Sequence, residues 1–123
     1  MIDTSVLIDF FRKTDKENSL LMNLVRQGYV FSISVITEYE IYSGATAIQK
    51  EYWQELLNKT KVFVFDKNAV TVAVEINKSL KQKRKQIELA DLFIAATAIT
   101  NSLPLATLNK KHFERIDTLT VVG

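Results

Sequence analysis

Short apolar runs alternate with longer amphipathic stretches along the whole chain. Runs rich in β-branched or aromatic residues predict strands at 1–3, 29–36, 61–65, 103–107 and 119–122. Apolar residues at spacings of three and four predict helices at 5–13, 17–28, 37–57, 66–84 and 90–100. Strands that alternate with helices need crossover connections, so the pattern predicts an α/β fold around a mostly parallel sheet.

Few residues interrupt these elements. The chain has three glycines and one proline, with no linker or repeat, which predicts a single domain over 1–123. Gly28 is placed to end the second helix, and Gly44 is placed to break the long helical stretch after it. Asp66 follows one predicted strand and begins a helix, so we expect it to cap that helix.

Three acids follow strands or interrupt apolar sequence, and each also has an ordinary structural explanation. Asp3 ends the first strand and could serve as a helix N-cap. Glu40 lies three residues after Thr37, which is the spacing of a capping box. Asp91 opens the apolar run DLFIAATAI and could interact with the positive end of a helix. In parallel α/β sheets, however, ligands bind beyond the carboxyl ends of the strands, where two of these acids lie.

Composition narrows the chemistry of any such site. The chain has no cysteine, which excludes disulfides, thiolate nucleophiles and thiolate zinc sites. His112 is the only histidine, and on a short helix it is expected to be partly exposed. A metal would therefore be held mainly by oxygen atoms, which favours Mg²⁺ or Mn²⁺ over zinc.

The net charge of +2 is too small to indicate a nucleic-acid partner by itself. A basic cluster at 78–85 could hold phosphates or could form a solvated helix end, and the sequence favours neither. No segment reaches the roughly 18 apolar residues of a membrane span, and no signal peptide is evident. We therefore expect a cytoplasmic protein with no membrane partner.

Four segments together resemble the PIN-domain ribonucleases, and most closely the VapC-type toxins of toxin–antitoxin pairs. They are IDTSVLIDF (2–10), SVITEYEIYSGA (34–45), ELADLFIAATAI (88–99) and ATLNKKHF (106–113). The resemblance covers essentially the whole chain. It implies an α/β/α sandwich with four to five short, mostly parallel strands.

The resemblance also assigns a site. It implies that Asp3, Glu40 and Asp91 are catalytic and hold Mg²⁺ or Mn²⁺, with Ser5, Thr37 and Thr107 supporting them. A fourth acid common in the family falls on Asn109, which offers an amide oxygen but no charge. Three converging carboxylates repel one another without a cation, and a divalent ion removes that cost.

The implied reaction is hydrolysis of RNA, and the implied partners are an RNA substrate, a cognate antitoxin and a second copy of the chain. The residues expected to contact the RNA backbone are Lys81, Lys83, Arg84, Lys85, Lys110 and Lys111. Two alternatives remain open at this point. One is an RNA-binding module whose activity is weakened by Asn109, and the other is a nuclease of the same fold outside a toxin–antitoxin pair.

Overall fold

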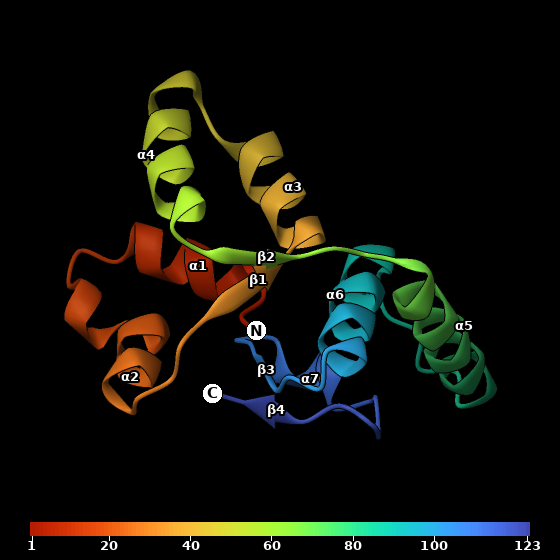
Figure 1. The fold of residues 1–123 in the computed structure, drawn as a ribbon. Helices are drawn as coiled ribbons and strands as arrows, with labels where there is room; N and C mark the ends of the chain where they lie inside the picture. The colour runs from red at the N-terminus through yellow and green to blue at the C-terminus, as the bar shows by residue number, and fades with distance from the viewer.

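The computed structural model describes residues 1–123 and contains seven α-helices and four strands in an α/β arrangement (Figure 1). The α-helices are α1 (Thr4–Arg12), α2 (Leu20–Arg26), α3 (Val35–Gly44), α4 (Ala47–Asn58), α5 (Lys67–Gln82), α6 (Leu89–Thr100) and α7 (Lys110–Phe113). The strands are β1 (Ser32–Ser34), β2 (Lys61–Phe63), β3 (Leu105–Ala106) and β4 (Val121–Val122), and a 3₁₀ turn spans Lys16–Asn18.

The strands form one parallel arrangement with the first residues of the chain at its centre. β1 pairs with β2 and β3 pairs with β4, both in parallel. Between them, Ile2 N–H donates to the carbonyl of Ser32 at 2.9 Å, and Ala106 N–H donates to the carbonyl of Met1 at 2.9 Å. The order is therefore β2, β1, residues 1–3, β3, β4, which confirms the predicted parallel sheet.

Two hydrophobic cores lie on opposite faces of this sheet. Met1 and Leu105 belong to the core formed with α5, α6 and α7, whereas Ile2 and Ala106 belong to the core formed with α1 to α4. Successive residues of a strand point to opposite faces, so each neighbouring pair serves both cores. Figure 1 shows the resulting layers, with α1 to α4 on one side and α5 and α6 on the other.

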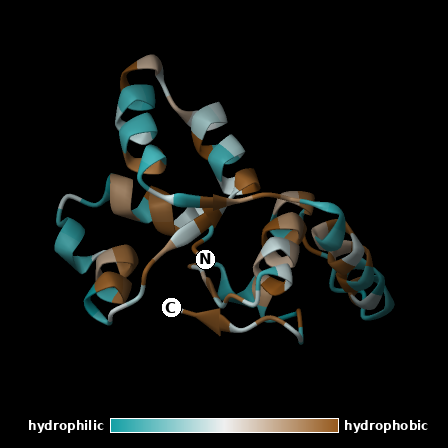
Figure 2. Cartoon of the chain, in the orientation of Figure 1, coloured by the Kyte–Doolittle hydropathy of each residue, from teal (hydrophilic) through white to brown (hydrophobic).

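The helices follow the apolar pattern of the sequence. In Figure 2 the ribbon of α6 is largely apolar along its length, whereas most of the ribbon of α4 beyond its first turn is hydrophilic. α6 is buried on most sides, and its alanines at 95, 96 and 98 allow the sheet and α5 to approach closely. No helix combines the length and the apolar character needed to cross a bilayer.

Element ends differ from the predictions where a side chain caps a helix. The predicted strand 29–36 is reduced to β1, because the hydroxyl of Ser34 accepts from Thr37 N–H and starts α3. The predicted helix 17–28 begins only after Ser19, which caps α2 in the same way. The break at Gly44 is confirmed, as is capping by Asp66, whose carboxylate accepts from Ala69 N–H. Gly28 follows the end of α2 with a φ of +92°, as expected for a helix C-terminus.

Candidate active site

The three predicted acids converge although 88 positions separate the outermost two. Asp3 leaves the central strand as the N-cap of α1, Glu40 lies on α3 after β1, and Asp91 lies in the first turn of α6. All three line one open pocket of about 660 Å³, together with Asn109 and His112. The pocket lies where the carboxyl ends of the strands meet, as expected for this class of sheet.

Asp3 is buried, with 2% of its surface exposed, and hydroxyl groups hold it in place. One carboxylate oxygen accepts from the N–H of Ser5 at 3.0 Å and from the Ser5 hydroxyl. The other accepts from the Thr107 hydroxyl at 2.6 Å. Burial raises the pKa of Asp3 above 3.8, and these hydrogen bonds oppose that rise. Asp3 therefore caps α1 and also presents a fixed carboxylate at the pocket floor.

The capping box expected for Glu40 is wrong. Ser34, not Thr37, is the N-cap of α3, so Glu40 lies beyond the first turn and cannot reach back to the cap. Its carboxylate instead accepts from the hydroxyl of Thr4 at 2.6 Å, across from α1. Thr4 Oγ1 also lies 3.2 Å from Thr37 Oγ1. Thr4 thus ties α1 to α3 and holds the Glu40 carboxylate beside the residue that follows Asp3.

Asp91 shows the electrostatic effect of this convergence. Burial raises its pKa above 3.8, and the charge of Asp3 raises it further. His112, whose Nδ1 lies 3.7 Å from Asp91 Oδ2, lowers the pKa, while Glu40 and Glu88 raise it. A carboxylate whose neighbours are mostly acids is costly to ionise, and a bound cation would offset that cost.

The donor set fits a hard divalent cation by its chemistry. The three acids and Asn109, which carry carboxylate and amide oxygens, line one pocket, and no thiolate is available. As they stand, no three acidic or histidine side chains are close enough together to hold an ion. The oxygens of Asp3 and Glu40 are instead occupied by hydroxyl donors.

Two of the three predicted supporting residues contact an acid, and the third contacts a neighbouring threonine. Ser5 and Thr107 contact Asp3 directly, and Thr37 contacts Thr4. Asn109 precedes α7 without capping it by its side chain, and its backbone N–H donates to the Thr107 hydroxyl at 2.9 Å.

The basic residues expected to contact RNA lie at two places. Lys110 and Lys111 are exposed on α7, beside the pocket residues Asn109 and His112. Lys81, Lys83, Arg84 and Lys85 lie at and after the end of α5, and none of them lines the pocket. Lys83 pairs there with Asp117 at 2.8 Å.

The structure adds pocket residues that the sequence did not identify. Thr4 positions Glu40, and Arg12 and Lys13 line the wall formed by α1. Ser5, Ile8 and Arg12 are spaced by three and four residues, and this helical spacing is the signal that could have placed Arg12 on the pocket wall.

Removing the Thr107 hydroxyl should destabilise the fold. Thr107→Val leaves one buried oxygen of Asp3 without its donor and Asn109 N–H without its acceptor, which lies at 2.9 Å. An unsatisfied buried group costs about 1–3 kcal/mol, and only the Asp3 oxygen is buried because Asn109 is exposed, so we expect a loss of unfolding free energy in that range. Urea denaturation measures it, and Thr14→Val, at an exposed position with no side-chain hydrogen bond, is the control. Equal stability of the two variants would contradict this account of Asp3.

Comparison with known proteins agrees with this geometry. A family model described as PIN domain matches residues 1–119. Ribonuclease VapC1 of Methanocaldococcus jannaschii is 36% identical over 117 residues, which cover 94% of this chain and 79% of that protein. Ribonuclease VapC10 of Mycobacterium tuberculosis is 31% identical over 120 residues, which cover 97% of this chain and 89% of that protein.

Solved structures show the same arrangement. VapBC-1 from nontypeable Haemophilus influenzae superimposes with a TM-score of 0.84 at 25% identity, covering 99% of this chain and 95% of that one. VapBC2 from Rickettsia felis, solved with a promoter DNA fragment, gives a TM-score of 0.81 at 23% identity over 99% of this chain and 96% of that one. The fold and the family match together show that this chain belongs to the PIN-domain family.

Proposed function

We propose that this protein is a metal-dependent endoribonuclease that hydrolyses RNA phosphodiesters in the cytoplasm, as the toxin of a VapBC-type pair. The observation that carries the proposal is the convergence of Asp3, Glu40 and Asp91 in one pocket at the carboxyl ends of the strands. Relatives that cover most of the chain are named ribonucleases, which supports RNA as the substrate.

The residues that would hold Mg²⁺ or Mn²⁺ are Asp3, Glu40 and Asp91, with Asn109 as an uncharged fourth donor. When bound, the ion would polarise the scissile phosphodiester and offset the charge of the transition state. Since Asn109 contributes no charge, we expect one tightly held ion rather than two.

The side chains around the acids have positioning roles in this proposal. Ser5 and Thr107 keep the carboxylate of Asp3 fixed, and Thr4 holds the carboxylate of Glu40. Carboxylates that are already held in place need no reorganisation during the reaction. Such preorganisation is the main source of electrostatic catalysis. His112 lies at the pocket edge with about half of its side chain exposed, so its free ring face can meet substrate.

We also propose a protein antitoxin as a partner, because several solved structures of this fold are VapBC complexes. A second copy of the chain is proposed from the family resemblance alone. An antitoxin that covers the pocket would block access of RNA to the acids. Of the aromatic residues on α3 and α4, Tyr39 is 70% exposed and is available for such contacts, whereas Trp53 is buried in the core.

Incubating the purified protein with total RNA tests the proposal. We expect cleavage with Mg²⁺ or Mn²⁺, and none after a chelator removes the ion. A cognate antitoxin added before the RNA should keep the RNA intact. RNA that stays intact with either metal, under conditions in which the protein is folded, would exclude the nuclease.

A further inference from the structure

The pocket carries too much negative charge to accept an RNA strand on its acids alone. Its walls include five carboxylates and only two side chains that are cationic at all physiological pH values. The carboxylates are Asp3, Asp9, Glu40, Glu88 and Asp91, and the cations are Arg12 and Lys13. One divalent ion does not neutralise five acids, so the phosphates on either side of the scissile one need another cation.

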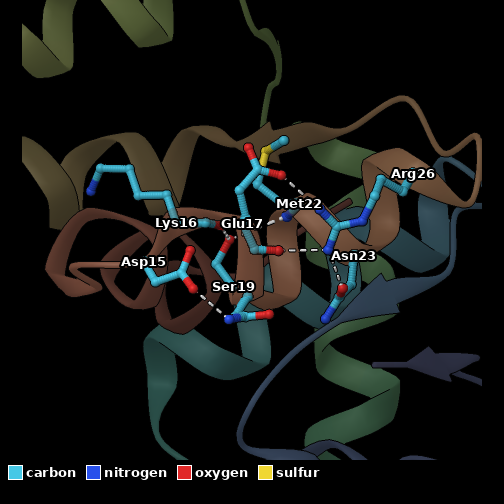
Figure 3. Close-up of polar contacts among 8 residues, drawn as sticks. Asp15, Lys16, Glu17, Ser19, Met22, Asn23 and Arg26 are labelled. Atoms are coloured by element: carbon cyan, nitrogen blue, oxygen red, sulfur yellow. Dashed lines mark hydrogen bonds and ion pairs between the residues drawn. The ribbon is translucent and has the colours of Figure 1, made fainter.

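Arg12 is the pocket cation that has no partner in the protein. Lys13 already lies 3.6 Å from Asp9, whereas Arg12 makes no hydrogen bond or ion pair, although its surroundings contain many acceptors. Outside the pocket, Arg26 at the end of α2 pairs with Glu17, which lies before that helix, and with Asn23 (Figure 3). Arg115 donates to the carbonyl of Gln86.

The ordinary reason for an arginine at a helix end does not apply to Arg12. A cation in the last turn usually interacts with the free carbonyls there. At the end of α1 that role belongs to Lys16, whose Nζ donates to the carbonyls of Phe10, Phe11 and Lys13 at 2.9, 3.1 and 3.3 Å. Arg12 is therefore left free to bind a ligand.

The position of Arg12 fixes which part of an RNA it can reach. Ser5, Ile8 and Arg12 form one stripe along α1 that faces the pocket. Seven residues separate Ser5 from Arg12, which is about 10 Å along the helix axis. Nucleotides of a stacked strand advance by about 3.4 Å each, and helical side chains lean toward the N-terminus. Arg12 thus lies within about three nucleotides of a phosphate bound at Asp3.

We propose that Arg12 binds a backbone phosphate of the RNA, one to three nucleotides from the cleavage point, so that the strand runs along the wall formed by α1. This inference rests on the proposed nuclease function. A guanidinium matches a phosphate with two parallel hydrogen bonds, which lysine cannot provide. Ile8 and the half-exposed Leu108 line the same pocket and give the strand an apolar surface there.

Binding measurements test the assignment. Arg12→Gln, Arg12→Lys and Lys50→Gln are each placed in an Asp91→Asn background, which prevents cleavage. Lys50 is exposed on α4, outside the pocket, and loses the same charge. The probe is a fluorescent single-stranded RNA that the wild-type protein cleaves at one site, and its affinity is measured over a range of salt concentrations.

We expect Arg12→Gln to weaken binding by about three- to tenfold and to lower the slope of log affinity against log salt by about 0.7, the value for one lost phosphate contact. Arg12→Lys should recover part of the affinity, and Lys50→Gln should match the parent protein. Replacing phosphates near the cleavage site by neutral methylphosphonates, one at a time, should identify one linkage at which Arg12→Gln no longer matters.

If Arg12→Gln binds the RNA as tightly as Lys50→Gln does, the assignment of Arg12 is overturned. Cleavage of RNA by the wild-type protein would in that case still support the proposed nuclease function. If RNA binding is unchanged but antitoxin binding falls, Arg12 contacts the antitoxin instead, which also overturns it. Absence of any RNA cleavage by the wild-type protein would remove the proposed function and this inference together.

Discussion

Replacing Asp91 by asparagine is expected to lower the rate of RNA cleavage by at least about a hundredfold while the protein stays folded. Asparagine keeps the shape of the side chain but removes the charge. Asp91 makes no hydrogen bond that holds the fold, and its closest polar partner is His112 at 3.7 Å. The loss therefore falls on metal binding and on the transition state rather than on the structure.

Cleavage of a labelled RNA and thermal melting, measured on one preparation, check this expectation. Asp3→Asn should lose as much activity. The matched control is Glu75→Gln, since Glu75 is an exposed acid on α5 that lines a different cleft. Turnover by Asp91→Asn at the rate of Glu75→Gln would contradict a catalytic role for the acid.

The second large effect is the stabilisation of the protein by a divalent ion at neutral pH. An ion that binds only the folded state adds about 2.7 kcal/mol at a concentration one hundred times its Kd. For a domain of this size that corresponds to a rise in melting temperature of roughly 10 °C. Wild-type protein should show this rise with Mg²⁺ or Mn²⁺ and lose it on chelation, whereas Asp91→Asn should show little.

Without a bound metal ion, the ionised carboxylate of Asp91 should lower the stability of the protein at neutral pH. Burial, and then the charge of Asp3, raise the pKa of Asp91 above 3.8, so the folded state binds a proton more readily than the unfolded chain. Stability conferred by protonation is therefore gained as pH falls through the raised pKa and lost as pH rises above it. Asp91→Asn, which never pays for ionisation, should be more stable than wild type at pH 7, and this difference should shrink toward pH 4.

Chemical denaturation with chelator present, at several pH values, measures that difference. Running both proteins in a His112→Gln background removes the contact between Asp91 and His112 from the comparison. A wild-type protein that is more stable than Asp91→Asn at pH 7 without metal would show that Asp91 is stabilised by its surroundings, and would count against a cluster of repelling acids.

The layers of the fold follow from local features of the sequence. The apolar periodicity of 66–84 and 90–100 predicts α5 and α6 within two residues, because both helices have a continuous buried face. Strand lengths were overestimated because hydrophobic runs continue into capped helices, as at Ser34, where a single hydroxyl ends β1. Whether a serine caps a helix depends on backbone direction, which periodicity alone does not fix.

The candidate site was also predictable from the sequence only in part. Asp3 and Asp91 stand out in the sequence because charged residues inside apolar runs require a reason. The role of Glu40 was harder to predict, because Thr37 and Glu40 match a capping box that the structure does not form. The Thr4 hydrogen bond to Glu40 joins residues 36 positions apart, and no pattern along the chain indicates it.

The most direct test of the central claim is titration of the purified protein with Mn²⁺ by calorimetry, comparing wild type with Asp3→Asn, Glu40→Gln and Asp91→Asn. If the three acids form one site, wild type binds a single ion tightly and each variant binds it at least about tenfold more weakly, since each loses one charged ligand. Glu75→Gln should bind like wild type. The account is contradicted if wild type does not bind Mn²⁺, or if removing any one of the three carboxylates leaves the affinity unchanged.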